Sequence, residues 1–398
     1  MLACMGPRSS GTMLNNSAAL TPTLTPTPPT RAPRRPRSMV RLVSFTAGAD
    51  AAPRVGVLIP LGAAEYAHTH VVDLVAAFAA DGGPPLTGGM RTLLSSLDSS
   101  SGIRVRTAAQ DGRWRTALAD TRLHAPITDP EKIICGARHQ FPMLACHRAR
   151  ALTEANRSRI AVGMNYHDHC AEIGVAVPKE PVLFGKFASS ITGPGCPIPL
   201  DEDLTSELDF EVELCIVVGK GGRRIPKERA LEHIAGWTVA HDVSARDLQL
   251  KRNGGQWLLG KTGDGYSPIG PCIVTRDEGP EFRDAGSLGL RTFLNGDVMQ
   301  NSNTSQLVFK PADVIEWASR YFSLTAGDLI FTGTPGGVGV FRKPPLHLKD
   351  GDEVVVEIDG LGRLHNTVRS AAKLAGLQPS SGAQLSGGVP GPSKRARL

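Results

Sequence analysis

The sequence lacks paired cysteines, because its seven cysteines form no C-x-x-C motif and lie mostly within apolar runs. This arrangement argues against a disulfide framework and favours reduced thiols in an intracellular compartment. Long apolar runs are also missing, and none approaches the roughly 20 residues that a membrane-spanning helix requires. We therefore expect neither a disulfide-stabilised secreted domain nor a membrane protein.

The body of the chain has no basic excess. The formal net charge is +6, yet residues 1–49 hold six Arg and residues 369–398 hold five Lys or Arg, with no acid in either segment. Residues 50–368 consequently hold 33 basic and 38 acidic residues. Because nucleic-acid binding needs a basic surface on the folded domain, the composition predicts no nucleic-acid partner.

The two ends of the chain have compositions that cannot bury an apolar face. Residues 1–38 are rich in Pro, Thr, Ser and Arg, so we expect a disordered leader. Its arginines and its lack of acid are typical of an organelle transit peptide and favour a mitochondrial protein, whereas a plain leader before Met39 favours the cytoplasm. Residues 369–398, rich in Ser, Gly and Pro, are expected to form a disordered tail.

Apolar periodicity predicts a small α+β domain over residues 39–128. Two strands, 40–45 and 55–59, and two short helices, 72–80 and 90–97, account for its apolar positions. Residues 129–160 are expected to form a linker, which begins like a strand at 131–135 and continues without a clear period.

The main domain is predicted over residues 161–368 and mixes short strands with Gly/Pro turns. Asn295-Gly296 suits a type I′ turn and predicts a hairpin, and residues 354–364 indicate a second one. Helices are expected at roughly 226–234, 244–251 and 311–321, the last opened by a proline.

Three carboxylates carry most of the functional information. Glu211 and Glu213 are two residues apart in a predicted strand, so their side chains point the same way, while Val212, Leu214, Ile216 and Val218 take the opposite, apolar face. Two like charges side by side are costly to desolvate, and a bound cation would remove that cost. Together with Asp242, they suggest a site for Mg²⁺ first, and then Mn²⁺ or Ca²⁺. The alternative is an exposed strand face with two solvated glutamates.

His169 and Glu172 are three residues apart in a segment that turns helical, so they are neighbours on a helix surface. A carboxylate bonded to an imidazole fixes its tautomer and raises its basicity, as a general base requires. A purely structural pair is the alternative. Zinc bound by His167, His169 and Cys170 is disfavoured, because no second ligand pair of suitable spacing follows.

Residues 255–262 match the phosphate-binding pattern G-x-x-x-x-G-K-[ST], but this interpretation is rejected. The interior of such a loop needs small residues, and Trp257-Leu258-Leu259 are bulky. Lys261 is better interpreted as a point charge near a substrate anion. Thr334, in a glycine-rich stretch after an apolar run, offers a hydroxyl to a carboxylate ligand.

Together these segments resemble the fumarylacetoacetate hydrolase superfamily and, within it, a mitochondrial group described as oxaloacetate tautomerases. The resemblance is weak over about 39–135 and strong over 161–368. It implies an α+β, mainly β protein: a catalytic domain built as a mixed β-sandwich or β-roll with a small α+β N-terminal domain, usually in a homodimer. The motifs that carry it are Val162–Cys170, Lys186–Ile191, Glu211-Val-Glu213, Val239–Asp247, Gln256–Thr262, Thr332–Pro335 and Gly337–Pro345.

The resemblance also implies roles for individual residues. Glu211, Glu213 and Asp242 fall on the metal ligands of the family, with Mg²⁺ as the cofactor. His169 and Glu172 fall on its acid/base dyad, in a segment that serves as a lid. Substrate-lining positions are matched by Arg246, Gln249, Lys261 and Thr334, and Lys261 is the rival of His169 for moving the proton.

The chain departs from its relatives in two places. Residues 136–160 look inserted within one continuous strand, as translated intron or as a tolerated surface loop. Gly263 and Gly265 stand where related sequences carry larger residues, which would widen the pocket.

The expected substrate is a small α-keto dicarboxylic acid. An oxo acid that chelates Mg²⁺ forms a stabilised enolate, and return of the proton to carbon completes a tautomerisation, most directly of oxaloacetate. The same enolate also supports hydrolysis of a C–C bond in acylpyruvates or β-diketones, and decarboxylation. An inactive, metal-stabilised dimer is the alternative from a different class.

Overall fold

The computed structural model describes residues 40–47, 52–60, 68–82, 86, 89–97, 100–111, 113–127, 133–135 and 158–376. The predicted leader, most of the predicted insertion at 136–160 and positions 377–398 of the predicted tail lie outside the described residues. Within them, no helix is long and apolar enough to span a membrane.

Thirteen of the described strands form one large sheet. Its order is β4-β3-β2-β1-β15-β13-β12-β18-β6-β8-β7, with β5 paired to β1 and β9 paired to β15. The central strands are rich in Val, Ile and other apolar residues, as expected where both faces of a sheet are covered. The strands are β1 (Arg41–Ala47), β2 (Arg54–Pro60), β3 (His68–Asp73), β4 (Arg115–Ala117), β5 (Thr121–His124), β6 (Ile133–Cys135), β7 (Ser158–Gly163), β8 (Val182–Phe187), β9 (Ile191–Thr192), β12 (Val212–Val218), β13 (Ile234–His241), β15 (Ser267–Thr275) and β18 (Leu329–Phe331).

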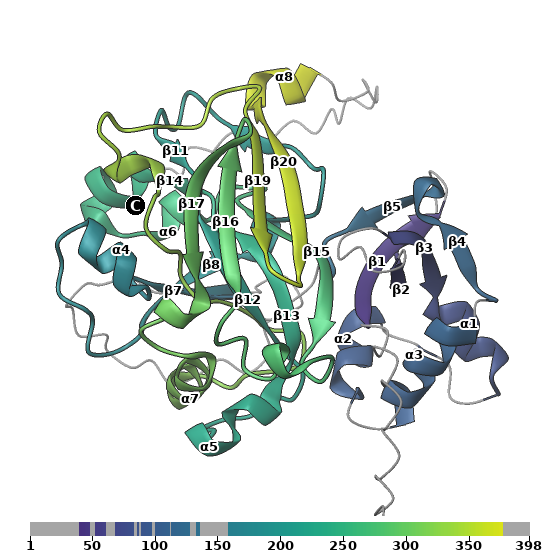
Figure 1. Ribbon diagram of the computed structural model, residues 1–398. Helices are drawn as coiled ribbons and strands as arrows, with labels where there is room; N and C mark the ends of the chain where they lie inside the picture. Colours follow the sequence, from purple (N-terminus) through teal and green to yellow (C-terminus); the bar gives the residue numbers. More distant parts are fainter. Residues whose placement is uncertain are drawn as a thin grey trace, which may run out of the picture. The chain divides into compact units, whose positions relative to one another are not determined.

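A second sheet of five strands has the order β10-β20-β19-β16-β17. Both predicted hairpins lie in it, and Figure 1 shows these strands side by side. Asn295 and Gly296 join β16 to β17 with φ values of 52° and 92°, as a type I′ turn requires. The strands are β10 (Ile198–Leu200), β16 (Gly289–Leu294), β17 (Asp297–Asn303), β19 (Glu353–Ile358) and β20 (Gly362–Ser370); β11 (Leu208–Asp209) pairs separately with β14 (Ser244–Ala245).

The N-terminal strands continue the main sheet, because β1 pairs antiparallel with β15 through Arg41–Val274 and Leu42–Ile273. The predicted helix over 72–80 starts later, since Val71 and Val72 belong to β3 and Asp73 caps the helix. The helix α3 was not predicted, because its sequence is polar and lacks a clear apolar stripe. The helices of this region are α1 (Leu74–Ala80), α2 (Gly89–Ser95) and α3 (Ser100–Asp111), with the 3₁₀ turn η1 (Leu118–Asp120).

The predicted helix over 311–321 is confirmed as α7, whereas the one over 244–251 divides into strand β14 and a π-helical turn, η4. The ordered chain also extends to Gly376, past the start of the tail predicted at 369. Beyond the N-terminal region the helices are α4 (His167–Glu172), α5 (Lys227–Ala230), α6 (Leu258–Lys261), α7 (Pro311–Tyr321) and α8 (Ala371–Gly376). The short turns are η2 (Ala188–Ser190), η3 (Leu231–His233), η4 (Asp247–Lys251), η5 (Asn253–Gly255), η6 (Pro280–Phe282), η7 (Thr304–Gln306) and η8 (Gly339–Phe341).

Strand β12 lies between two apolar cores. Val212, Leu214, Ile216 and Val218 pack into one core with residues of the five-stranded sheet, as their alternation predicts. The opposite face is buried too, because Cys215 and Val217 belong to a second core. The two glutamates of this strand region therefore project from a face that is not exposed to solvent.

Strand β6 precedes the predicted insertion, strand β7 begins within it at Ser158, and both pair antiparallel with β8. Ile134 and Cys135 pair with Gly185 and Phe184, and Val162 and Gly163 pair with the next two residues of β8, Leu183 and Val182. In the β7 ladder the partner of Phe184 would be residue 161, which lies twenty-six positions after residue 135. Ser158 and Arg159, inside the predicted insertion, pair with Phe187 and Lys186 in the same β7 ladder, so the last residues of 136–160 belong to the sheet and the interruption of a single strand stays a prediction.

Deletion of residues 136–161 joins Cys135 to Val162 and removes Ser158 and Arg159, so β6 is expected to take over their pairing with Phe187 and Lys186. Closing a loop of this length costs roughly 3 kcal/mol of chain entropy, so the deletion should raise the melting temperature by a few degrees. Differential scanning calorimetry of the full chain and the variant measures this change.

The matched control deletes only residues 136–160. One extra residue turns every following side chain to the other face of the sheet, so this variant should melt below the full chain. Equal destabilisation by both deletions would show that β6 and β7 are not parts of one strand.

Candidate metal centre and active site

Two neighbouring strands bring the three predicted metal ligands together. Glu211 directly precedes β12, Glu213 is its second residue, and Asp242 directly follows β13. Glu213 pairs with Ala240 in the ladder, and the Asp242 N–H donates to the Glu211 carbonyl at 2.9 Å. This register sets Asp242 across from Glu211, so all three carboxylates share one face.

The three carboxylates form a buried cluster. Glu211, Glu213 and Asp242 are 6%, 2% and 1% exposed, and each offers a ligand atom within 4.8 Å of the other two. The alternative of solvated glutamates on an exposed strand is therefore wrong. In the described part of the chain, no comparable group includes His167, His169 or Cys170.

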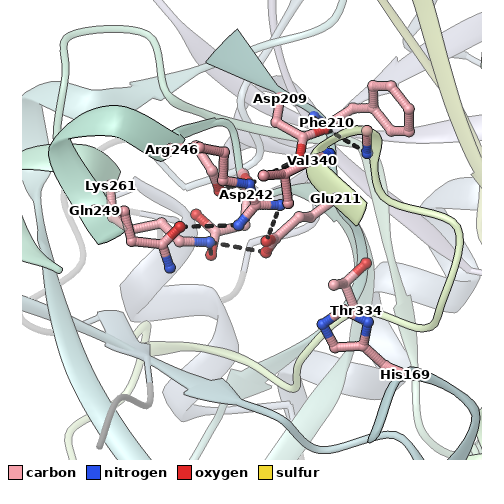
Figure 2. Close-up of polar contacts among 12 residues, drawn as sticks. His169, Asp209, Phe210, Glu211, Asp242, Arg246, Gln249, Lys261, Thr334 and Val340 are labelled. Atoms are coloured by element: carbon pink, nitrogen blue, oxygen red, sulfur yellow. Dashed lines mark hydrogen bonds and ion pairs between the residues drawn. The ribbon is translucent and has the colours of Figure 1, made fainter. Parts of the chain in front are cut away.

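Buried cations hold two of the three carboxylates (Figure 2). The Lys261 ammonium donates to Glu211 Oε2 and Asp242 Oδ2, both at 2.8 Å, and Lys186 donates to Asp242 Oδ1 at 2.5 Å. The Arg246 guanidinium lies 2.7 Å from Glu211 Oε1. Lys261 is the last residue of α6, and its ammonium is bound by side-chain carboxylates rather than left to bind a phosphate.

Asp209 extends this network on the far side of Arg246. Its carboxylate accepts hydrogen bonds from Arg246 Nε at 2.7 Å and from the backbone N–H groups of Phe210, Gly339 and Val340 at 2.7 to 3.0 Å. Arg246 Nη1 also donates to Gln249 Oε1 at 2.9 Å. Asp209 therefore orients the arginine and holds turn η8 beside it, as Figure 2 shows.

Glu213 is the carboxylate of this cluster that has no cationic partner among the described residues. Its Oε2 accepts the Gly333 N–H at 2.5 Å. Burial, together with repulsion from Asp242 and Glu211, raises the pKa of Glu213 well above its usual value. In contrast, Lys261 and Arg246 outweigh the effect of burial on Glu211 and lower its pKa.

These donors fit a hard divalent cation. The ligand atoms are all carboxylate oxygens, which Mg²⁺, Mn²⁺ and Ca²⁺ prefer. The raised pKa of Glu213 and the ammonium that bridges Glu211 and Asp242 both show that the site has an excess of negative charge. A divalent ion would relieve this repulsion and allow all three carboxylates to stay ionised.

The predicted acid/base dyad forms the opposite wall of the site. Helix α4 places His169 Nδ1 2.9 Å from Glu172 Oε2, and Glu172 Oε1 accepts the Gly337 N–H at 2.8 Å. Burial would raise the pKa of Glu172, but the bonds from His169 and Gly337 outweigh it and lower the pKa. Gly337 has φ +102°, and a Cβ there would lie 2.4 Å from the Met299 carbonyl oxygen, so glycine is required for this contact.

Other contacts fix helix α4 and Thr334. Asp168 accepts hydrogen bonds from Ser302 and from the Gly336 N–H, which ties α4 to β17 and to the glycine-rich loop. Gln300 donates to Thr334 Oγ1 at 2.8 Å and to the Pro335 carbonyl at 2.9 Å. The Thr334 hydroxyl therefore keeps its own proton free to donate toward the cavity.

All nine predicted site residues except Glu172 line one cavity of about 160 Å³. The cluster of carboxylates and cations lies on one side, and His169 and Thr334 lie across from it (Figure 2). The remaining wall is apolar and includes an edge-to-face pair of Phe184 and Trp257, with ring centroids 5.4 Å apart. Phe341 lies 5.9 Å from the His169 ring.

The sequence analysis did not identify Asp209, Lys186, Gln300 or Phe341 as site residues. Asp209 continues the two-residue spacing of Glu211 and Glu213, and this signal was available. Lys186 is an isolated charge in the apolar strand β8, which is a second usable signal. Gln300 lies in the polar strand β17 and Phe341 in turn η8. No local pattern marks either residue, because only folding brings them to the cavity.

Comparison with known proteins agrees with this architecture. The family profile described as "Fumarylacetoacetate (FAA) hydrolase C-terminal" matches residues 158–369. A mitochondrial oxaloacetate tautomerase of Xenopus laevis is 44% identical over 333 residues, which cover 84% of this chain and 91% of the relative. A human mitochondrial oxaloacetate tautomerase is 48% identical over 244 residues, covering 61% of this chain and 68% of the relative.

Solved structures show the same fold. The fumarylacetoacetate hydrolase of psychrophilic Exiguobacterium antarcticum has a TM-score of 0.62 and 32% identity, and the match covers 83% of this chain and 99% of that chain. A 2-hydroxyhepta-2,4-diene-1,7-dioate isomerase of Mycobacterium marinum has a TM-score of 0.57 and 30% identity over 83% and 99% of the two chains. The chain therefore belongs to the fumarylacetoacetate hydrolase family, a family of enzymes, and the predicted mainly β, α+β fold is confirmed.

Metal uptake is expected to release a proton from Glu213. Because its pKa is raised, the carboxyl binds a proton below that pKa and must lose it to become a ligand, so Mg²⁺ affinity should rise with pH and level off above it. Isothermal titration calorimetry of Mg²⁺ in two buffers of different ionisation enthalpy measures the released proton.

The Glu213→Gln variant should lose this proton release and most of the Mg²⁺ affinity. Glu357→Gln is the matched control, since Glu357 also lies on a strand but bonds to Arg291 and Arg363 away from the cluster. Mg²⁺ binding that is independent of pH and releases no proton would contradict the assignment.

Proposed function

We propose that the protein is a divalent-metal-dependent tautomerase of oxaloacetate, with Mg²⁺ as the metal. This proposal rests mainly on the buried triad of carboxylates, which faces the His169–Glu172 dyad across one small cavity. The relatives described as oxaloacetate tautomerases support the choice of substrate.

Glu211, Glu213 and Asp242 would hold the metal. When bound, the metal supplies Lewis-acid stabilisation to the enolate of a chelating oxo acid. Arg246, Gln249 and Lys261 offer donors to the carboxylates of the substrate, and the Thr334 hydroxyl offers another from the opposite wall. These groups fix the substrate relative to the dyad and exclude water from it.

His169 is proposed to move the proton. Its Nδ1 donates to Glu172, whose lowered pKa keeps it a carboxylate, and this bond assigns Nε2 as the nitrogen that exchanges protons. In the ketonisation direction the enol oxygen loses a proton and C3 gains one, so no water and no redox partner are consumed.

Lys261 is less suited to act as the base. Burial would lower its pKa, but Asp242 and Glu211 outweigh that effect and raise it, so the side chain stays an ammonium. An ammonium bonded to two carboxylates has no free lone pair to accept a proton. Its proposed role is to balance charge at the metal site and to attract the anionic end of the substrate.

Cleavage of acylpyruvates is a second candidate function. The apolar wall with Phe184 and Trp257 suits an apolar acyl group rather than the second carboxylate of oxaloacetate. The same enolate chemistry applies, with water attacking the second carbonyl. No feature of the cavity favours decarboxylation of oxaloacetate in the same way. An inactive dimer is disfavoured because His169 and Glu172 are in hydrogen-bond contact.

The activity is tested by the loss of absorbance of enol-oxaloacetate with purified protein and Mg²⁺. His169→Ala should lower kcat by about 10²- to 10⁴-fold, because it removes the proton-transfer group. Chelation with EDTA should abolish activity, and added Mg²⁺ should restore it. Acetylpyruvate in the same assay distinguishes the hydrolase from the tautomerase.

His365→Ala is the matched control, because that histidine lies on β20 with half of its side chain exposed and away from the cavity. Its kcat should equal that of the unchanged protein. A full rate for His169→Ala, with a melting temperature unchanged, would remove the dyad from the mechanism.

Location and assembly are proposed on the same basis. The mitochondrial relatives, together with the arginine-containing, acid-free segment 1–38, support a mitochondrial protein. The family resemblance supports a homodimer with no nucleic-acid or membrane partner. A tagged full chain should fractionate with the mitochondrial matrix, and recovery in the cytosol would overturn the location.

A further inference from the structure

Lys261 occupies a special place in the carboxylate cluster. It is 1% exposed, and its ammonium bridges Glu211 Oε2 and Asp242 Oδ2 at 2.8 Å each. It therefore contacts two of the three side chains that are proposed to hold the metal. A single positive charge in this position reduces the repulsion between the carboxylates, as a metal ion would.

The other buried cations are arranged differently. Lys186 is fully buried and donates to Asp242 Oδ1 at 2.5 Å and to the Tyr266 carbonyl at 2.9 Å, so it contacts one carboxylate of the triad. Arg246 contacts Glu211 through one guanidinium nitrogen and Asp209, which is not a member of the triad, through another. Among the described residues, Lys261 is the only cation that bridges two members of the triad.

The oxygen atoms of the triad are nearly all engaged. Both oxygens of Glu211 and both oxygens of Asp242 contact a cationic group, and Glu213 Oε2 accepts the Gly333 N–H. A divalent ion bound by all three residues therefore competes with the buried cations for carboxylate oxygens, and Lys261 is the cation that holds oxygens of two of these residues. Its double positive charge would also repel an ammonium held between the same two side chains.

We propose that Lys261 is the internal counter-cation of the metal-free site and gives up at least one carboxylate contact when a divalent ion binds. Because Lys261 lines the cavity beside Gln249 and Phe184, the lysine is then available to the carboxylate of a substrate. Metal binding thus prepares an anion-binding group. This inference rests on the proposed metal site but does not depend on the tautomerase reaction.

The test compares Lys261→Met with Lys186→Met by calorimetric titration of Mg²⁺ into metal-free protein. Both variants remove one buried ammonium that donates to Asp242, so the gain for the metal at that carboxylate is matched. Only Lys261→Met also removes a charged donor to Glu211, so it should bind Mg²⁺ about 10- to 100-fold more tightly than Lys186→Met.

Lys261→Arg should bind Mg²⁺ no more tightly than the unchanged protein, because it retains a competing cation. Equal or weaker Mg²⁺ binding by Lys261→Met than by Lys186→Met would overturn the exchange of contacts. Failure of the unchanged protein to bind Mg²⁺ would instead overturn the proposed metal site. These two failures are therefore distinguishable.

A second measurement uses the unchanged protein, so it does not depend on whether a variant folds. Acetic anhydride labelling of the unchanged protein, followed by mass spectrometry of the peptide that contains Lys261, reports the reactivity of this amine. Labelling should accelerate several-fold on addition of Mg²⁺, while labelling of the surface residue Lys251 should not change. Slower or unchanged labelling of Lys261 would contradict its release.

Discussion

The site depends on the electrostatic cost of placing four carboxylates in a nearly closed interior. Asp209, Glu211, Glu213 and Asp242 are buried together, and the charged groups beside them are one arginine and two lysines. One negative charge remains without a partner, and the pKa of Glu213 is raised as a result. A divalent cation would change this local balance from negative to positive, which suits an anionic oxo acid.

The scaffold contributes the rigidity that this arrangement needs. The strands β12 and β13 pair in register through the centre of the large sheet, and apolar cores cover both faces of β12. Carboxylates that repel one another would otherwise move apart or take up protons. The fixed ladder holds them close, so the repulsion remains available to favour cation binding.

The acid/base side is built from less regular structure. Helix α4 is short, and it is positioned by Asp168 and Glu172, which bond to the glycine-rich loop after β18 and to β17. The loop needs Gly337 because its φ is positive and the Met299 carbonyl lies close. The fold thus supplies the carboxylate cluster through paired strands and the His169–Glu172 pair through a glycine-rich loop that fixes helix α4.

The sequence by itself indicated the shared face of Glu211 and Glu213 and the contact of His169 with Glu172, because strand alternation and helical spacing are local properties of the chain. It also predicted both hairpins of the five-stranded sheet from turn chemistry. Only the tertiary structure decided that Lys261 bridges two carboxylates and that Ser158 and Arg159, inside the segment 136–160, pair with β8. The physical reason is that these contacts join segments far apart in the chain, whose approach depends on sheet pairing rather than on local pattern.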